Sequence, residues 1–360
     1  MCLNILVQFL SSIVGRVKRF CNVPEETTTP NSQQAAAATH MSSSRSSIET
    51  GLTGPENIRD WNSCESGKET LIVIFFHGLE LNDGVSTENK HLTTWSYQDE
   101  KEQCWPRTMF KEDVELQQSN IVIRALAASY DSSKYTTNTE GRVDIFNLGE
   151  NLAHTIITEV KKMHKQSGRM TPVILVAHSI GGLVVQEMIS HAFTKVKPQM
   201  YDASARQFLR SLSGIFFYST PQGSLKNETY EAIFSGGRGK VTSHVAKLQS
   251  EHNVILSRKR GEFVNIIAAI ENEADLRNHK KIEIQSVFES LPTKVITSKG
   301  KWEGMIVEEG SSRSLHLGND TYTNIKANHF DVCRPESGEK GFGQNQYQFL
   351  KNFILRVMES

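Results

Sequence analysis

The stretch PVILVAHSIGGLVVQEMI, residues 172–189, joins two kinds of hydrophobic pattern through a turn. Residues 172–177 are a short continuous apolar run, which is typical of a strand buried on both faces of a sheet. Residues 181–194 have the apolar spacing of a helix. The stretch therefore predicts a strand that leads into a sharp turn at Ser179 and continues directly into a helix.

Other parts of the chain repeat this alternation. Four further short apolar runs predict strands at 71–76, 121–126, 213–218 and 282–288. Besides the helix after Ser179, helical patterns occur at about 144–166, 241–270 and 344–357. Strands that alternate with helices favour an α/β fold, with a mostly parallel central sheet and helices on both faces.

The composition excludes several classes of protein. The 360 residues include 40 Lys and Arg and 40 Asp and Glu, and this balance argues against a nucleic-acid-binding protein. No apolar stretch reaches the roughly 18 residues of a membrane-spanning helix. The cysteines have no metal-ligand spacing, and their odd number indicates free thiols in a reducing, intracellular compartment. They are Cys2, Cys21, Cys64, Cys104 and Cys333.

The N-terminal region differs from the rest of the chain. Residues 1–21 have apolar side chains at helical spacing, carry basic residues and contain no acid. Such an amphipathic basic segment predicts organelle targeting or peripheral membrane contact, and a helix packed on the domain is the alternative. Residues 22–69 are polar and partly of low complexity, which indicates a disordered linker. The folded domain is therefore expected at residues 70–360.

Ser179 lies in a motif that is typical of a nucleophilic serine. A serine at a strained turn between a strand and a helix needs small residues two positions before and two positions after it. Ala177 and Gly181 meet this need, although glycine is commoner at the first position. The N-terminus of the following helix favours a developing negative charge. We expect Ser179 to be the nucleophile, and the alternative is a plain Ser-Gly turn.

A serine also needs a base, and the base needs an orienting acid. In proteins with this turn the chain order is Ser, then acid, then His. His329 is the expected base because it lies in a short polar loop before the final helix, and His316 is the competitor. Glu289, at the end of the strand predicted at 282–288, is the first candidate for the acid. Three later glutamates compete with it: Glu303, Glu308 and Glu309.

Two backbone N–H groups are candidates for an oxyanion hole, because acyl transfer places negative charge on the substrate oxygen. One is the N–H of Ile180, directly after the serine. The other is the N–H of Leu79, in the loop after the first strand, where Gly78 allows close approach of the backbone. The alternative for His77-Gly78 is an ordinary turn at the end of a strand.

Several motifs, taken together and in this order, make the chain similar to the serine active site-containing protein family, a lipase-like branch of the α/β-hydrolases. The resemblance covers about residues 70–357, and Gln222 departs from a frequent histidine. The motifs are FFHGL (75–79), WPR (105–107), ALAASYDSS (125–133), ENLAHTI (150–156), VAHSIGGLVVQE (176–187), GIFFYSTPQGS (214–224), FESLPT (288–293), IVEEGSSR (306–313) and ANHFDVCRP (327–335).

The resemblance implies an α/β-hydrolase fold and a serine esterase or acyltransferase that acts on lipids. It also implies an association with mitochondrial or endoplasmic-reticulum membranes and with phospholipid remodelling. Neither the resemblance nor the motifs imply a metal or another cofactor. A small helical insertion is expected at about 225–280, either as a lid or as helices packed on the sheet. The alternative function is a catalytically silent α/β-hydrolase that acts as a binding or scaffold protein.

Overall fold

The computed structural model describes most of the chain beyond residue 57. The N-terminal segment 1–21 and most of the linker predicted at 22–69 lie outside the described residues, so the prediction of targeting or membrane contact stays a prediction. The described residues are 58–61, 67–78, 90–100, 102–130, 145–197, 200–223, 225–230, 254–273, 275–276, 281–297, 300–313 and 320–359.

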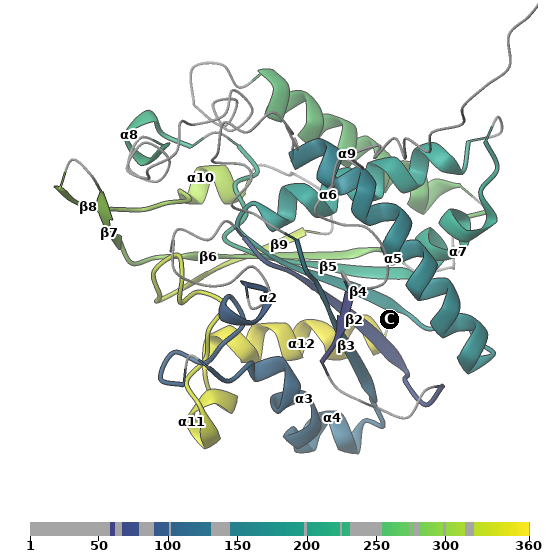
Figure 1. The fold of residues 1–360 in the computed structure, drawn as a ribbon, viewed down its shortest axis with the longest axis horizontal. Helices are drawn as coiled ribbons and strands as arrows, with labels where there is room; N and C mark the ends of the chain where they lie inside the picture. The colour runs from purple at the N-terminus through teal and green to yellow at the C-terminus, as the bar shows by residue number, and fades with distance from the viewer. Residues whose placement is uncertain are drawn as a thin grey trace, which may run out of the picture. The chain divides into compact units, whose positions relative to one another are not determined.

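A seven-stranded sheet forms the centre of this domain (Figure 1). Its strand order is β1-β3-β2-β4-β5-β6-β9, and every neighbouring pair is parallel except β1 and β3. The five strands predicted from apolar runs are all present. The strands are β1 (Ile58–Asp60), β2 (Leu71–Phe76), β3 (Ile123–Ala128), β4 (Val173–His178), β5 (Leu212–Tyr218), β6 (Glu283–Glu289) and β9 (Asp320–Ile325).

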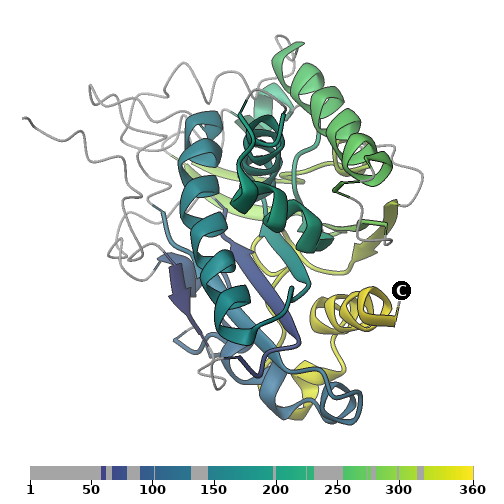
Figure 2. The same ribbon diagram turned by 90° about the vertical axis from the view of Figure 1, so that its right-hand side faces the viewer.

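Helices cover both faces of the sheet, as Figures 1 and 2 show. One face carries α5 (Ile145–Ser167), α6 (Gly181–Lys195), α7 (Ala203–Ser211) and α9 (Val254–Asn272). The other face carries α3 (Met109–Glu112), α4 (Val114–Gln118) and α12 (Asn345–Glu359). The mostly parallel sheet between two helical layers confirms the predicted fold class, because a parallel sheet must bury both of its faces.

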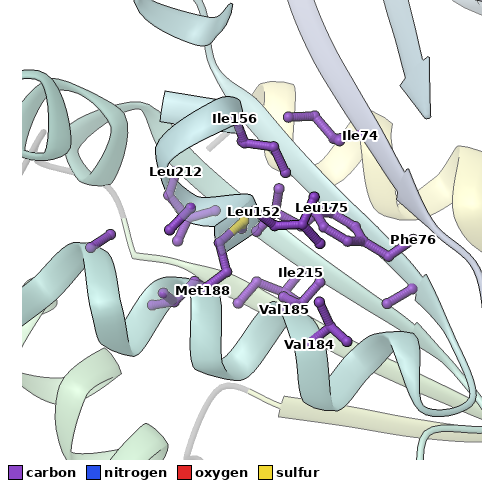
Figure 3. Packing of buried hydrophobic residues seen from close by; sticks show 14 of the residues in the cluster. Ile74, Phe76, Leu152, Ile156, Leu175, Val184, Val185, Met188, Leu212 and Ile215 are labelled. Carbon is purple, nitrogen blue, oxygen red and sulfur yellow. The ribbon is translucent and has the colours of Figure 1, made fainter. Parts of the chain in front are cut away.

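Two hydrophobic cores lie on the two sides of the sheet. Strand residues alternate between them: Ile72 and Ile74 enter one core, whereas Leu71 and Val73 enter the other. Burial of one such side chain contributes about 1.5–3 kcal/mol. Figure 3 shows the core under α5 and α6, where Leu152, Ile156, Val184, Val185 and Met188 pack over Leu175 and Ile215.

The structure adds elements that the hydrophobic pattern did not predict. Residues 58–60, inside the predicted linker, form the edge strand β1, so the sheet begins before residue 70. Strand β9 (DTYTNI) is polar and lies at the opposite edge, where only one neighbour pairs with it. Edge strands are incompletely buried, so their sequences need not contain the continuous apolar run from which the other strands were predicted. Helix α7 was also missed.

The segment expected as an insertion at 225–280 is described only in part. Helix α8 (Asn227–Tyr230) begins it, and α9 packs against α6, with Phe263 and Ile267 in the core. This described part is an ordinary helix on the sheet.

Several short elements complete the described fold. They are α2 (Lys90–Thr93), the 3-10 turn η2 (Trp105–Arg107), the hairpin of β7 (Thr293–Thr297) and β8 (Gly300–Gly304), α10 (Glu309–Ser312) and α11 (Gly338–Phe342).

The strand order also locates a crevice. Strands β3 and β4 lie on opposite sides of β2. The chain therefore passes from β2 to β3 on one side and then crosses over to β4 on the other side. Ligands of open α/β sheets bind beyond the carboxyl ends of the strands at such a switch point. Here the carboxyl ends of β2 and β4 carry Gly78 and Ser179. A Cβ atom added to Gly78 would lie 2.7 Å from Cβ of Ser179, so the two turns are in contact.

Candidate active site

Ser179 lies at the sharp turn between β4 and α6, in the conformation that a nucleophile elbow requires. Its φ is +54°, in the left-handed region that side chains rarely adopt. The turn is tight because its glycines leave no space for side chains. A Cβ on Gly181 would lie 2.5 Å from the carbonyl oxygen of His77, and one on Gly182 would lie 2.2 Å from Oγ1 of Thr220. These glycines therefore allow the helix to start directly behind the serine.

Three predicted site residues come together beyond the carboxyl ends of β4, β6 and β9. Nε2 of His329 lies 3.0 Å from Oγ of Ser179. Nδ1 of His329 lies 3.3 Å from both carboxylate oxygens of Glu289. All three side chains are buried. The two ring nitrogens thus link the hydroxyl group to the carboxylate, although Ser179 and His329 are 150 positions apart in the sequence.

Glu289 is held by further hydrogen bonds of its carboxylate and its backbone. Its Oε1 accepts the N–H of Val307 at 2.7 Å, and its own backbone N–H donates to Oγ of Ser219 at 3.0 Å. Burial alone would raise the pKa of Glu289. The charge and hydrogen bond of His329, together with the hydrogen bonds of Ser219 and Val307, outweigh burial, and the pKa is lowered. Glu289 is therefore an ionised acceptor.

The peptide of His329 is anchored on both sides. Its N–H donates to Oγ1 of Thr293 at 2.9 Å, and its carbonyl oxygen lies 2.9 Å from Nε2 of His178. Neither partner is among the residues predicted from the sequence. Thr293 directly follows the loop after Glu289, and His178 directly precedes Ser179, so proximity to the motifs was the available signal.

The expected oxyanion donors are described only in part. Ile180 is the N-cap residue of α6, and the first N–H groups of a helix have no partner within the helix. Leu79 lies outside the described residues. The backbone that leads to it is fixed, because the Tyr130 hydroxyl donates to the carbonyl oxygen of His77 and the two rings stack at 3.9 Å.

Each of the three competing glutamates is paired with a cation. His316 is outside the described residues. Glu303 faces Lys294 across the β7–β8 hairpin at 3.7 Å, and Glu308 pairs with Lys226. Glu309 pairs with Arg313 one helical turn later at 2.8 Å. The structure therefore brings Glu289, rather than these three glutamates, to His329.

Gln222, the departure from the family pattern, is also buried. It accepts a hydrogen bond from the side-chain amide of Gln186 on α6. The loop that follows β5 is thereby tied to the helix behind Ser179. This contact lies beside the elbow and does not involve Ser179, His329 or Glu289.

The described residues form neither a metal-binding cluster nor a membrane-spanning helix. Among these residues, no group of three or more His, Cys, Asp or Glu side chains has a geometry that could hold a metal ion. None of the described helices combines the length and the apolar character needed to cross a membrane.

Known proteins resemble parts of this chain. Residues 66–223, which include the elbow, match the family model described as "Putative serine esterase (DUF676)". Protein SERAC1 of Homo sapiens is 23% identical over 302 residues, which cover 80% of this chain and 40% of that protein. Protein SERAC1 of Danio rerio is 23% identical over 290 residues, or 78% and 39% of the two chains. The chain thus spans about two fifths of the length of these relatives.

Solved structures show a more distant likeness. Phospholipase PlaB from Legionella pneumophila aligns at a TM-score of 0.36 and 13% identity, over 62% of this chain and 39% of that chain. The apo form of Thermogutta terrifontis esterase 2 aligns at a TM-score of 0.40 and 10% identity, over 86% and 95% of the two chains. The mostly parallel sheet between two helical layers is an α/β-hydrolase fold, and residues 66–223 are similar to the serine esterase family that this model describes.

Proposed function

We propose that this chain is a serine esterase or acyltransferase in which Ser179, His329 and Glu289 form the catalytic triad. The observation that carries the proposal is the continuous arrangement of hydroxyl, imidazole and carboxylate, with distances of 3.0 Å and 3.3 Å. A neutral imidazole in this position accepts the hydroxyl proton at Nε2 and donates its Nδ1 proton to the carboxylate.

The reaction follows from these contacts. Oγ of Ser179 attacks the ester carbonyl carbon while Nε2 of His329 takes the hydroxyl proton, and the carbonyl electrons move to oxygen. Collapse of this tetrahedral species breaks the bond to the alcohol, which leaves with the proton from His329. Water or a second alcohol then attacks the acyl-serine through the same proton route. Glu289 stays ionised and stabilises the imidazolium that forms twice in each cycle.

Stabilisation of the tetrahedral oxyanion is assigned to backbone donors. The N–H of Ile180 lies at the N-terminus of α6, whose dipole favours negative charge. The N–H of Leu79 is the proposed second donor, since Gly78, the residue before it, lies against Ser179.

Lipid acyl esters are the proposed substrate class, and the support for this choice is the resemblance to a lipase-like family. The proposed location is a mitochondrial or endoplasmic-reticulum membrane, with peripheral contact through residues 1–21. Deletion of residues 2–21 should move the protein from the membrane fraction to the soluble fraction of a cell lysate. An unchanged distribution would favour a packed N-terminal helix.

A fluorophosphonate probe tests the proposed enzyme against a silent scaffold. We expect wild-type protein to be labelled, with the label mapped to Ser179 by mass spectrometry, and Ser179→Ala protein to remain unlabelled. Hydrolysis of p-nitrophenyl acetate and p-nitrophenyl palmitate then compares short and long acyl chains. Folded wild-type protein that neither reacts with the probe nor cleaves either ester would support the scaffold function.

A further inference from the structure

His178, the residue before Ser179, makes a contact that the proposed triad does not use. Its side chain is buried and lies at the end of β4. Nε2 of its ring is 2.9 Å from the carbonyl oxygen of His329, which is 151 positions later in the sequence. The elbow therefore contacts the backbone of the proposed base as well as presenting the serine to its ring.

The partner atom determines the protonation state of His178. A carbonyl oxygen can only accept a hydrogen bond, so Nε2 of His178 carries a proton. Within the part of the chain that the structure describes, Nδ1 of the same ring is buried without a hydrogen-bond partner. A second proton at Nδ1 would have no acceptor. The ring is therefore a neutral Nε2–H tautomer that donates to the backbone.

The surroundings of the ring disfavour a positive charge. A Cβ on Gly78 would lie 3.0 Å from Nδ1, and the ring of Trp95 packs edge-on at 6.5 Å between centroids. Burial lowers the pKa of His178 well below its usual value, and the charges of His329, Arg334 and His77 act in the same direction. The hydrogen bond to the carbonyl group of His329 opposes this shift and does not reverse it.

We propose that His178 is a positioning residue, a neutral donor that fixes the His329 peptide so that its ring reaches both Ser179 and Glu289. This inference rests on the proposed function. Thr293 accepts the N–H of His329 and His178 donates to its C=O, so the peptide is held from two sides. Two anchors restrict rotation of the backbone from which the ring extends. His178 does not touch the substrate or the transferred proton.

A matched control exists on helix α5. His164 is also buried, and its Nε2 lies 3.0 Å from the carbonyl oxygen of Thr171. Among the described residues, its Nδ1 is likewise without a hydrogen-bond partner. The two histidines share one type of contact, but the partner of His164 is not a proposed catalytic residue. Loss of either contact should affect stability, and only loss of the His178 contact should affect the position of the base.

The test compares His178→Leu, His178→Gln and His164→Leu in the full chain. We expect His178→Leu to lower kcat on an active p-nitrophenyl ester by about 10–100-fold with KM nearly unchanged, since small displacements of a catalytic group have effects of this size. His178→Gln, whose amide can replace the Nε2–H donor, should recover most of that loss. His164→Leu should lower Tm by a similar amount and leave kcat within about twofold. Equal kcat values for the two leucine variants would overturn the proposal.

Structural measurements keep the inference independent of activity. Crystal structures should show the 3.0 Å contact between His329 and Ser179 kept in His178→Gln and lost in His178→Leu, and a contact kept in His178→Leu would contradict the inference. If the leucine variant does not fold, ¹⁵N NMR of wild-type protein decides: a neutral Nε2–H tautomer at pH 5 is expected, and an imidazolium refutes it. An inactive wild-type protein would overturn the proposed function, whereas these measurements would still decide the role of His178.

Discussion

Two clusters of polar side chains on this domain contain similar residue types but differ in how their hydrogen bonds are arranged. The first is the buried set of Ser179, His329 and Glu289 at the carboxyl edge of the sheet. The second is a groove of about 560 Å³, which α5, α6 and α9 line. The groove residues are Asn147, Glu150, Glu187, Ser190, His191, Phe193, Thr194, Lys197, Lys259, Glu262, Asn265 and Ile266.

The groove contains the same residue types in a different arrangement. Glu187 pairs with Lys259 at 2.8 Å, and His191 lies 3.4 Å from Glu150. The Ser190 hydroxyl donates to the carbonyl oxygen of Gln186 in its own helix at 2.8 Å. Its proton is therefore directed at a backbone acceptor rather than at a base. Serine, histidine and glutamate side chains near a cavity are therefore not sufficient for the proposed catalysis. The hydrogen bonds must also link the hydroxyl group to the imidazole and the imidazole to the carboxylate.

The largest expected effect distinguishes the two serines. Ser179→Ala should reduce kcat on an activated ester by about 10⁶-fold, because it removes the only atom that forms the covalent intermediate in the proposed mechanism. Ser190→Ala should leave kcat within about twofold, because that hydroxyl donates its hydrogen bond within its own helix. Steady-state hydrolysis of purified, folded variants measures both. Residual activity of more than a few per cent in Ser179→Ala would refute the proposed nucleophile.

The next largest expected effect is the difference in kcat between Glu289→Gln and the same change at other glutamates. Glu289→Gln should lower kcat by about 10³–10⁴-fold, because an amide cannot stabilise the imidazolium. The same change at Glu187, in the groove, should lower kcat by less than about tenfold, and so should changes at Glu303, Glu308 and Glu309. A loss at one of these positions as large as that of Glu289→Gln would contradict the assignment of the acid.

Two helical glycines extend the comparison to stability. Gly182→Ala should destabilise the fold by about 1–3 kcal/mol, because the new methyl group would lie 2.2 Å from Oγ1 of Thr220. Gly261→Ala, on α9, should stabilise it by about 0.5–1 kcal/mol, because alanine favours a helix and, among the described residues, no atom outside the local helix backbone lies within 4 Å of the added Cβ. Urea denaturation of both variants measures these changes. A stable Gly182→Ala protein would show that the elbow can relax around a side chain.

The smallest effect concerns pH. Because the folded-state pKa of Glu289 is lowered, its carboxylate stabilises the fold above the unfolded-state pKa of about 4.3. This contribution is lost as the pH falls through the folded-state pKa. The difference in unfolding free energy between wild type and Glu289→Gln should therefore narrow from pH 6 to pH 3. A difference that stays constant over this range would contradict the lowered pKa.

The central strands and the elbow could be predicted from the sequence, because these features follow from short-range rules. A continuous apolar run is typical of a strand buried on both faces. The run at 71–76 is β2 with the same bounds, and the run at 172–177 is β4 with each end one residue later. The strained conformation of Ser179 was also predictable, since only small neighbours such as Gly181 permit it. Chain order then directed attention to His329 and to an acid that precedes it.

Long-range packing selects which of the four glutamates contacts His329 and which partners hold the backbone of the base. Glu289 lies 40 positions from His329, and Val307, Ser219 and His178 come from three further segments of the chain. The edge strands β1 and β9 were decided in the same way, by pairing with β3 and β6 rather than by their own hydrophobicity. These contacts join residues that are distant in the sequence, and no local pattern encodes a distance between them.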